Sequence, residues 1–249
     1  MSRSPDGSHA RFGRTARIKT SDSGAVRRHA AGLPGEAALR RSALYSEALG
    51  IDLASGRDSD LFLWFLASLL FGQRISERIA RKTYHAFVRH GLTTPDRILA
   101  AGWDYLVNPV MREGGYIRYD ESKSRKILRA CAMLLETYGG SLSCLHAMAS
   151  DGNELEQRLL AFYGVGPVTV NIFLRELRPF WSKAEPEPLP VVKLLAQEAG
   201  VDLMQYDRKT LVFARLEAGL IRLRHTARDG HRHATRLRNR TGGGADGIG

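Results

Sequence analysis

Cysteine is scarce in this chain, and so are long hydrophobic runs. Its 249 residues include only Cys131 and Cys144, too few for a disulfide framework or for a four-cysteine zinc or iron–sulfur site. The N-terminal region lacks the continuous apolar stretch of a signal peptide. The most apolar run, Leu61–Phe71, spans 11 residues and is too short to cross a bilayer. These absences predict a cytoplasmic protein with free thiols, no metal centre and no membrane anchor.

Alternating apolar and polar positions, which are typical of strands, are also missing over any useful length. Apolar residues instead recur at helical spacing, and hydrophobic residues make up 43% of the chain, enough for a core. The expected helices cover residues 36 to about 49, 75 to about 90, 155–162, 168–177, 191–199 and 211–223. A further helix starts with a cap at residue 58 or 59 and ends at 71, and a short one opens at 94–95. Another starts with a cap at residue 120 or 122 and ends at the glycines 139–140. The sequence therefore predicts an all-α protein.

Positive charge is concentrated at the two ends of the chain. Of a formal net charge of +11, residues 1–41 carry +6 and residues 225–249 carry +3, which leaves +2 for the middle. We expect residues 1–35 to form a disordered basic arm and residues 226–249 a disordered tail rich in Arg, His and Gly. The folded domain then covers residues 36–225, and the global charge says little about what that domain binds.

The most specific motif is a glycine-containing turn between two apolar segments, LLAFYGVGPVTVN over residues 159–171. Gly164 and Gly166 allow a tight turn and a close backbone approach, and Pro167 suits the first turn of a following helix. The free N–H groups at such a helix start form a natural phosphate site. Although Gly-x-Gly alone is more often only a turn, its place between apolar helices predicts a phosphate-binding helical hairpin over residues 155–178.

Over residues 59–200 the chain resembles the helix-hairpin-helix superfamily of DNA glycosylases that includes endonuclease III. The matching segments are the apolar helix Leu61–Gln73, the run Tyr119–Lys123 with the helix Lys126–Glu136, and the hairpin Phe162–Val170. We therefore expect a two-lobed all-α fold with a DNA cleft between the lobes. One lobe would hold the middle helices and the hairpin, and the other the N-terminal helix and the helices after Pro190.

The resemblance also implies DNA-binding roles for particular residues. Gln73 would fill the gap left by a flipped nucleotide, although it can equally cap a helix end. The turn Gly164–Val165–Gly166 would hold a phosphate through backbone N–H groups, with Thr169 supporting that turn. A monovalent cation held by nearby carbonyls is implied at the hairpin, without an iron–sulfur cluster or another cofactor. The expected partner is double-stranded DNA, bound by a monomer associated with the nucleoid.

Two departures from the family pattern concern catalysis. Bifunctional relatives carry a nucleophilic Lys two residues after the second glycine, where this chain has Val168, which can form no Schiff base. The family's essential Asp falls near residues 186–190, which contain no Asp. Glu187 and Glu185 are the nearest carboxylates and become the candidate catalytic residues, because one well-placed carboxylate can stabilise positive charge or orient a water. Both are equally well explained as solvated loop glutamates.

These residues predict base-excision repair of DNA. We expect a monofunctional glycosylase that hydrolyses the bond to a damaged or mismatched base on a flipped nucleotide, without β-lyase activity. The alternative is a non-catalytic helix-hairpin-helix protein that recognises distorted DNA, and base release separates the two. A third hypothesis is a helical interaction module whose basic tails bind RNA or acidic partners. A preference for damaged duplex separates the first two hypotheses from the third.

Overall fold

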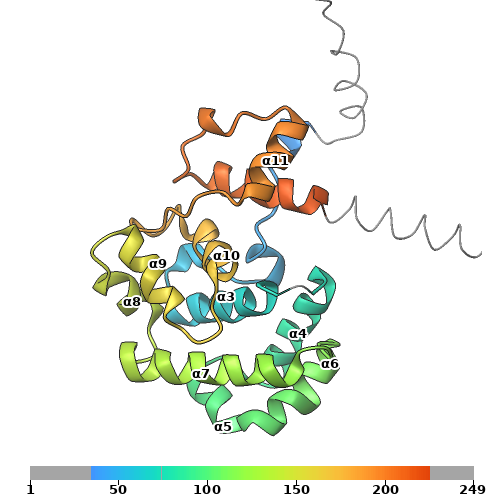
Figure 1. Cartoon of the computed structure of the whole chain (residues 1–249), viewed down its shortest axis with the longest axis vertical. Helices are drawn as coiled ribbons and strands as arrows, with labels where there is room; N and C mark the ends of the chain where they lie inside the picture. The colour runs from blue at the N-terminus through green and yellow to red at the C-terminus, as the bar shows by residue number, and fades with distance from the viewer. Residues whose placement is uncertain (1–34, 74, 225–249) are drawn as a thin grey trace, which may run out of the picture. The chain divides into compact units, whose positions relative to one another are not determined.

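The computed structural model describes residues 35–73 and 75–224, and in these residues the chain forms helices and no strand (Figure 1). The elements are α2 (Glu36–Leu39), η1 (Glu47–Leu49), η2 (Leu53–Ser55), α3 (Asp58–Phe71), α4 (Glu77–Arg89), α5 (Pro95–Tyr105), η3 (Leu106–Met111), α6 (Arg112–Gly114), α7 (Asp120–Tyr138), α8 (Leu142–Met148), α9 (Gly152–Leu160), α10 (Pro167–Leu177), α11 (Pro190–Ala199), η4 (Leu203–Gln205) and a last helix over residues 211–224. The predicted all-α class is confirmed here. The predicted arm and tail, residues 1–35 and 226–249, lie almost entirely outside the described residues.

Several helix ends follow local signals in the sequence. At the start of α5 the Thr94 hydroxyl accepts a hydrogen bond from the Arg97 backbone N–H, and Pro95 occupies the first helical turn. At the end of α7, Gly139 adopts a left-handed conformation with φ of 61°, which glycine tolerates better than other residues. Both ends agree with the sequence prediction, because their capping groups come from within one helical turn.

The cap predicted at the start of α3 is different in the structure. Asp58 is the first residue of α3, and no side chain caps that helix. Its carboxylate accepts hydrogen bonds from Ser143 N at 2.9 Å and from the Ser141 hydroxyl at 2.7 Å. Asp58 therefore binds the start of α8, a helix that Ser141 caps and that was not expected from the sequence.

The continuous helix expected over residues 36–49 is wrong in its middle, because only α2 and η1 are helical there. The buried carboxylate of Glu176, on α10, accepts hydrogen bonds from Tyr45 N at 2.8 Å and from Ser46 N at 2.9 Å. A distant side chain thus satisfies backbone amides that a continuous helix would satisfy itself.

The larger of two hydrophobic clusters is centred on α3 and α10. The ring of Phe65 lies edge-on to Phe162 at 5.3 Å and to Phe173 at 5.5 Å, and the Trp64 indole N–H donates to the Phe173 carbonyl. Each fully buried large apolar side chain contributes about 1.5–3 kcal/mol. Although α3 is the most apolar helix, no helix in residues 35–73 or 75–224 is long and apolar enough to cross a membrane.

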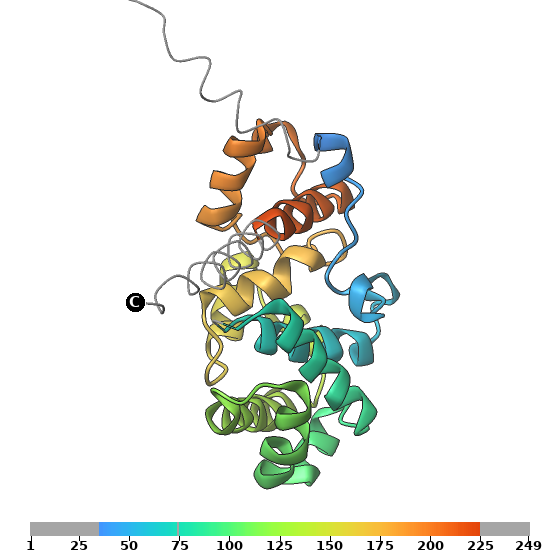
Figure 2. The ribbon, with the colours of Figure 1, turned by 90° about the vertical axis from the view of Figure 1, so that its right-hand side faces the viewer.

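The smaller cluster joins α2, α11 and the helix over residues 211–224, which Figure 2 shows together. Its buried members are Leu39, Val192, Ala196, Val201, Leu216 and Leu220. A buried ion pair between Arg178, which follows α10, and Glu217 links the last helix to the end of α10. These are the segments that the sequence analysis assigns to a second lobe.

Candidate nucleic-acid interface

Gly164 lies in the turn that joins α9 to α10, and the fold requires glycine there. Its φ of +80° belongs to the left-handed region that side chains disfavour. A Cβ at this position would also lie 2.5 Å from Cγ and Cδ of Lys126, on α7. The next residue, Val165, is buried, and its N–H closes the turn by donating to the Phe162 carbonyl at 3.0 Å.

Gly166 is different, because nothing in the described residues demands glycine at this position. Its φ of −116° and ψ of 174° are extended values that any residue adopts, and no heavy atom lies within 4 Å of a Cβ built there. Pro167 begins α10, so the N–H groups of Val168 and Thr169 have no acceptor within the helix, and no side chain of residues 35–73 or 75–224 caps this helix start. The missing side chain leaves space in front of a helix start that favours negative charge.

Basic side chains of α7 border this turn. The aliphatic carbons of Lys126 lie against Gly164, and the Arg129 guanidinium carbon lies 4.2 Å from the ring centre of Tyr163. Tyr163 is 52% exposed, so the stacked guanidinium is held at the surface of the turn. Sequence reasoning missed both cations, because α7 is separated from the turn by α8 and α9.

The end of α3 packs against the first turn of α10. A Cβ at Gly72 would lie 2.1 Å from the Thr169 hydroxyl oxygen, so the two backbones approach closely. Thr169 is buried in this contact, and Gln73 follows directly and is half-buried. The structure thus brings Gln73 and Thr169, two predicted DNA-binding residues, to one place. Their roles toward DNA stay predictions.

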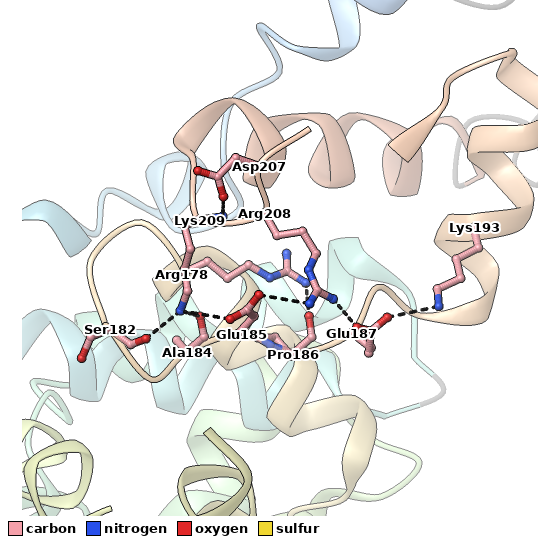
Figure 3. Close-up of polar contacts among 10 residues, drawn as sticks. All are labelled: Arg178, Ser182, Ala184, Glu185, Pro186, Glu187, Lys193, Asp207, Arg208 and Lys209. Atoms are coloured by element: carbon pink, nitrogen blue, oxygen red, sulfur yellow. Dashed lines mark hydrogen bonds and ion pairs between the residues drawn. The ribbon is translucent and has the colours of Figure 1, made fainter. Parts of the chain in front are cut away.

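Glu185 and Glu187, the predicted catalytic residues, carry ion-paired carboxylates (Figure 3). Arg208 pairs with both, at 3.0 Å from Glu185 Oε1, and Lys193 Nζ lies 3.2 Å from Glu187 Oε2. The Glu187 side chain is 68% exposed, and hydrogen bonds from Arg208 and then Lys193 lower the pKa of its carboxyl group. Glu187 is therefore an ionised group at neutral pH and a weak base.

The backbone of this segment is anchored to α10 and the residue after it. The Asn171 side-chain amide donates to the Glu187 carbonyl at 2.7 Å, and the Arg178 guanidinium donates to the Pro186 carbonyl. Arg178 is buried, where it also forms the ion pair with Glu217 and lies over the Phe213 ring at 5.1 Å. The position of Glu187 is thus set by groups that are far from it in sequence.

A cleft of about 230 Å³ lies between α9, the start of α10 and this segment. It is lined by Glu156, Leu160, Pro167, Val170, Asn171, Pro186, Glu187, Pro188, Leu189 and Pro190. Partial burial, and then the charge of Glu187, raise the pKa of Glu156, which makes Glu156 the stronger base of the two. Sequence reasoning missed Glu156, because on α9 it looks like an ordinary polar residue of an amphipathic helix. Val168 is 49% exposed and is not among the lining residues.

The described part of the chain contains no side-chain cluster suited to a metal ion. Within residues 35–73 and 75–224, no three side chains of His, Cys, Asp and Glu come together as metal ligands would. The monovalent cation expected at the hairpin would use backbone carbonyls, and it stays a prediction.

None of the protein-family models, curated proteins or solved structures compared with this chain matches it. The resemblance to helix-hairpin-helix glycosylases therefore rests on the residues named above.

Proposed function

We propose that this chain binds double-stranded DNA through the turn between α9 and α10, as a helix-hairpin-helix motif does. Gly166 carries the proposal. Neither its backbone conformation nor its packing among the described residues requires glycine, whereas a phosphate approaching the N–H groups of α10 does require that space.

The basic side chains near the turn also favour a phosphate ligand. The aliphatic part of Lys126 lies against Gly164, and the exposed ring of Tyr163 orients Arg129, so two basic residues adjoin the turn. Backbone N–H groups and basic side chains recognise phosphates without reading bases. Binding through this turn is therefore independent of sequence and weakens as salt concentration rises.

Gly166→Asp tests the proposal, with Gly35→Asp as the matched control. Gly35 also has a negative φ and open space around its Cβ, so both variants add the same charge without a clash. We expect Gly166→Asp to weaken binding to a labelled duplex at least about tenfold in fluorescence anisotropy, since hydrogen bonds to charged groups contribute roughly 1.5–3 kcal/mol. Gly35→Asp and deletion of residues 1–34 should have smaller effects. A Gly166→Asp protein that is folded and binds as tightly as the control contradicts the proposal.

Hydrolytic removal of a base is a second candidate function, favoured by the cleft beside the turn. Breaking an N-glycosidic bond builds positive charge on the sugar, which an ionised Glu187 suits, while the raised pKa of Glu156 suits activation of a water. The ion pairs of Glu187 with Arg208 and Lys193 compete with the first role. Val168 excludes a Schiff base at its own position.

The abasic sites formed in duplexes that carry uracil, alkylated purines, 8-oxoguanine or mismatches would measure this activity. We expect base release without a protein–DNA adduct that borohydride traps. Glu187→Gln, or as second choice Glu185→Gln, should abolish base release and retain DNA binding. Glu156→Gln tests the water-activating role separately. If no duplex loses a base, the non-catalytic alternative, recognition of distorted DNA, replaces this candidate. If the wild type releases base and all three variants stay active, the catalytic carboxylate lies elsewhere.

A further inference from the structure

A second group of polar side chains gathers where α4, α5 and α6 end. His90 follows α4, Tyr105 is the last residue of α5, and Glu113 lies in α6. His90 Nε2 lies 2.8 Å from Glu113 Oε2, and His90 Nδ1 lies 2.8 Å from the Tyr105 hydroxyl oxygen. One imidazole thus joins a carboxylate to a phenol.

The proton positions in this group follow from the carboxylate. Hydrogen bonds from His90 and then Arg89 lower the pKa of Glu113, so its carboxyl group is ionised and only accepts hydrogen bonds. In its neutral form, the imidazole that donates to this carboxylate carries its proton on Nε2, which leaves Nδ1 to accept the Tyr105 O–H. The order carboxylate, imidazole, hydroxyl is the arrangement that activates hydroxyl nucleophiles in enzymes.

The scaffold beneath these side chains is closely packed. A Cβ at Gly114 would lie 2.1 Å from the Thr83 hydroxyl oxygen and 2.5 Å from Thr83 Cα, so α6 rests directly on α4 beside Glu113. Leu92 and Leu106, which lie within two residues of His90 and Tyr105 in sequence, are buried. Groups on packed helices hold their geometry better than groups on loops do.

An open cleft of about 520 Å³ adjoins the group. It is lined by His90, Gly91, Leu92, Arg97, Ala100, Ala101 and Tyr105. Tyr105 is 41% exposed and forms part of the lining of the cleft. Arg97 supplies a positive charge in the same lining, and the alanines leave room for an acyl chain.

We propose that Tyr105 is a nucleophile for acyl transfer, with His90 as its general base and Glu113 as the residue that positions His90. The substrate class is a small carboxylic ester with an anionic group for Arg97. The Tyr105 oxygen forms a bond to the carbonyl carbon, and its proton passes to His90 Nδ1. The ester C–O bond breaks, and the leaving alkoxide takes that proton. Water then hydrolyses the acyl-tyrosine to the free acid.

Acetylation by p-nitrophenyl acetate tests this assignment, with Tyr119 as an internal reference. Tyr119 is 39% exposed, close to Tyr105, but its ring lies under the Arg118 guanidinium instead of beside an imidazole. Peptide mass spectrometry of the full chain should show Tyr105 acetylated about 100-fold faster than Tyr119, the size of effect that general-base catalysis gives. Equal rates at the two tyrosines overturn the proposal.

Variants separate chemistry from structure in the same experiment. Tyr105→Phe should abolish the fast release of p-nitrophenolate, and Tyr119→Phe should leave it unchanged. His90→Gln should reduce Tyr105 to the rate of Tyr119, and Arg97→Gln should raise KM for p-nitrophenyl hemisuccinate but not for the neutral acetate. The thermal unfolding midpoint of each variant reports its folding. A folded His90→Gln protein that keeps fast Tyr105 acetylation also overturns the proposal.

Discussion

The turn over residues 161–166 and the segment over residues 182–190 both adjoin the start of α10, but they are built in opposite ways. At the turn, Gly166 leaves space in front of the helix N–H groups, and the Arg129 guanidinium stacks on the exposed Tyr163 ring. In the segment, Glu187 is paired with Arg208 and Lys193, and the backbone is anchored by Asn171 and Arg178. An anion therefore meets open donors at the turn, whereas the charges of the segment already have partners within the protein.

The largest effect on stability is expected from replacing Arg178, the buried residue that anchors the segment. Arg178→Met removes the partner of the buried Glu217 carboxylate and the donor to the Pro186 carbonyl. We expect urea unfolding to show a loss of about 3–5 kcal/mol, because an unpaired charge is left in the interior. The double variant Arg178→Met, Glu217→Leu should recover much of that loss. A single variant as stable as the wild type would show that the segment does not depend on Arg178.

Lys123 lies on α7, the helix that borders the turn, and it should make the stability of the protein depend on pH. Its buried Nζ donates to the Leu69 carbonyl of α3, and burial lowers its pKa to about 7. The unfolded chain, with a lysine pKa of about 10.4, binds more protons between pH 7 and 10, so stability rises with pH there. Relative to Lys123→Met, the wild type should gain about 2 kcal/mol from pH 7 to pH 9. A difference that is constant with pH would mean that Lys123 is charged when folded.

The two glycines of the turn should separate folding from binding. Gly164→Ala places a side chain at a positive φ against Lys126, and we expect it to destabilise the protein by about 1–2 kcal/mol. Gly166→Ala meets open space and should change stability by less than about 0.5 kcal/mol. Urea unfolding measures both. Equal losses in the two variants would remove the distinction on which the DNA-binding proposal depends.

A small effect is also expected for Glu187→Gln, because its ion pairs are exposed. Their contribution should be under about 1 kcal/mol at pH 7. Because the folded pKa of Glu187 is lowered, this contribution is present above the unfolded pKa of about 4.3 and is lost as pH falls through the folded value. The unfolding curves of variant and wild type should therefore converge in acid. A difference that grows below pH 4 would contradict the pairing.

Local signals were enough to predict much of the fold. The apolar run of α3, the Thr94–Pro95 start of α5 and the Gly139 end of α7 depend on neighbours within a turn or two. The helix expected over residues 36–49 failed where Glu176, distant in sequence, binds the amides of Tyr45 and Ser46. Capping and periodicity describe local competition only, so they contain no information on such a partner.

The sequence by itself determined the helical class, the turn at Gly164–Gly166 and the presence of carboxylates at 185 and 187, because residue type and short-range order fix these features. Only the tertiary structure decided which groups meet. It set Arg129 against Tyr163, raised the pKa of Glu156 by partial burial and the charge of Glu187, and joined His90 to Tyr105 and Glu113. Hydrogen bonds and ion pairs act over a few ångströms, and helix packing brings together side chains that no sequence spacing relates.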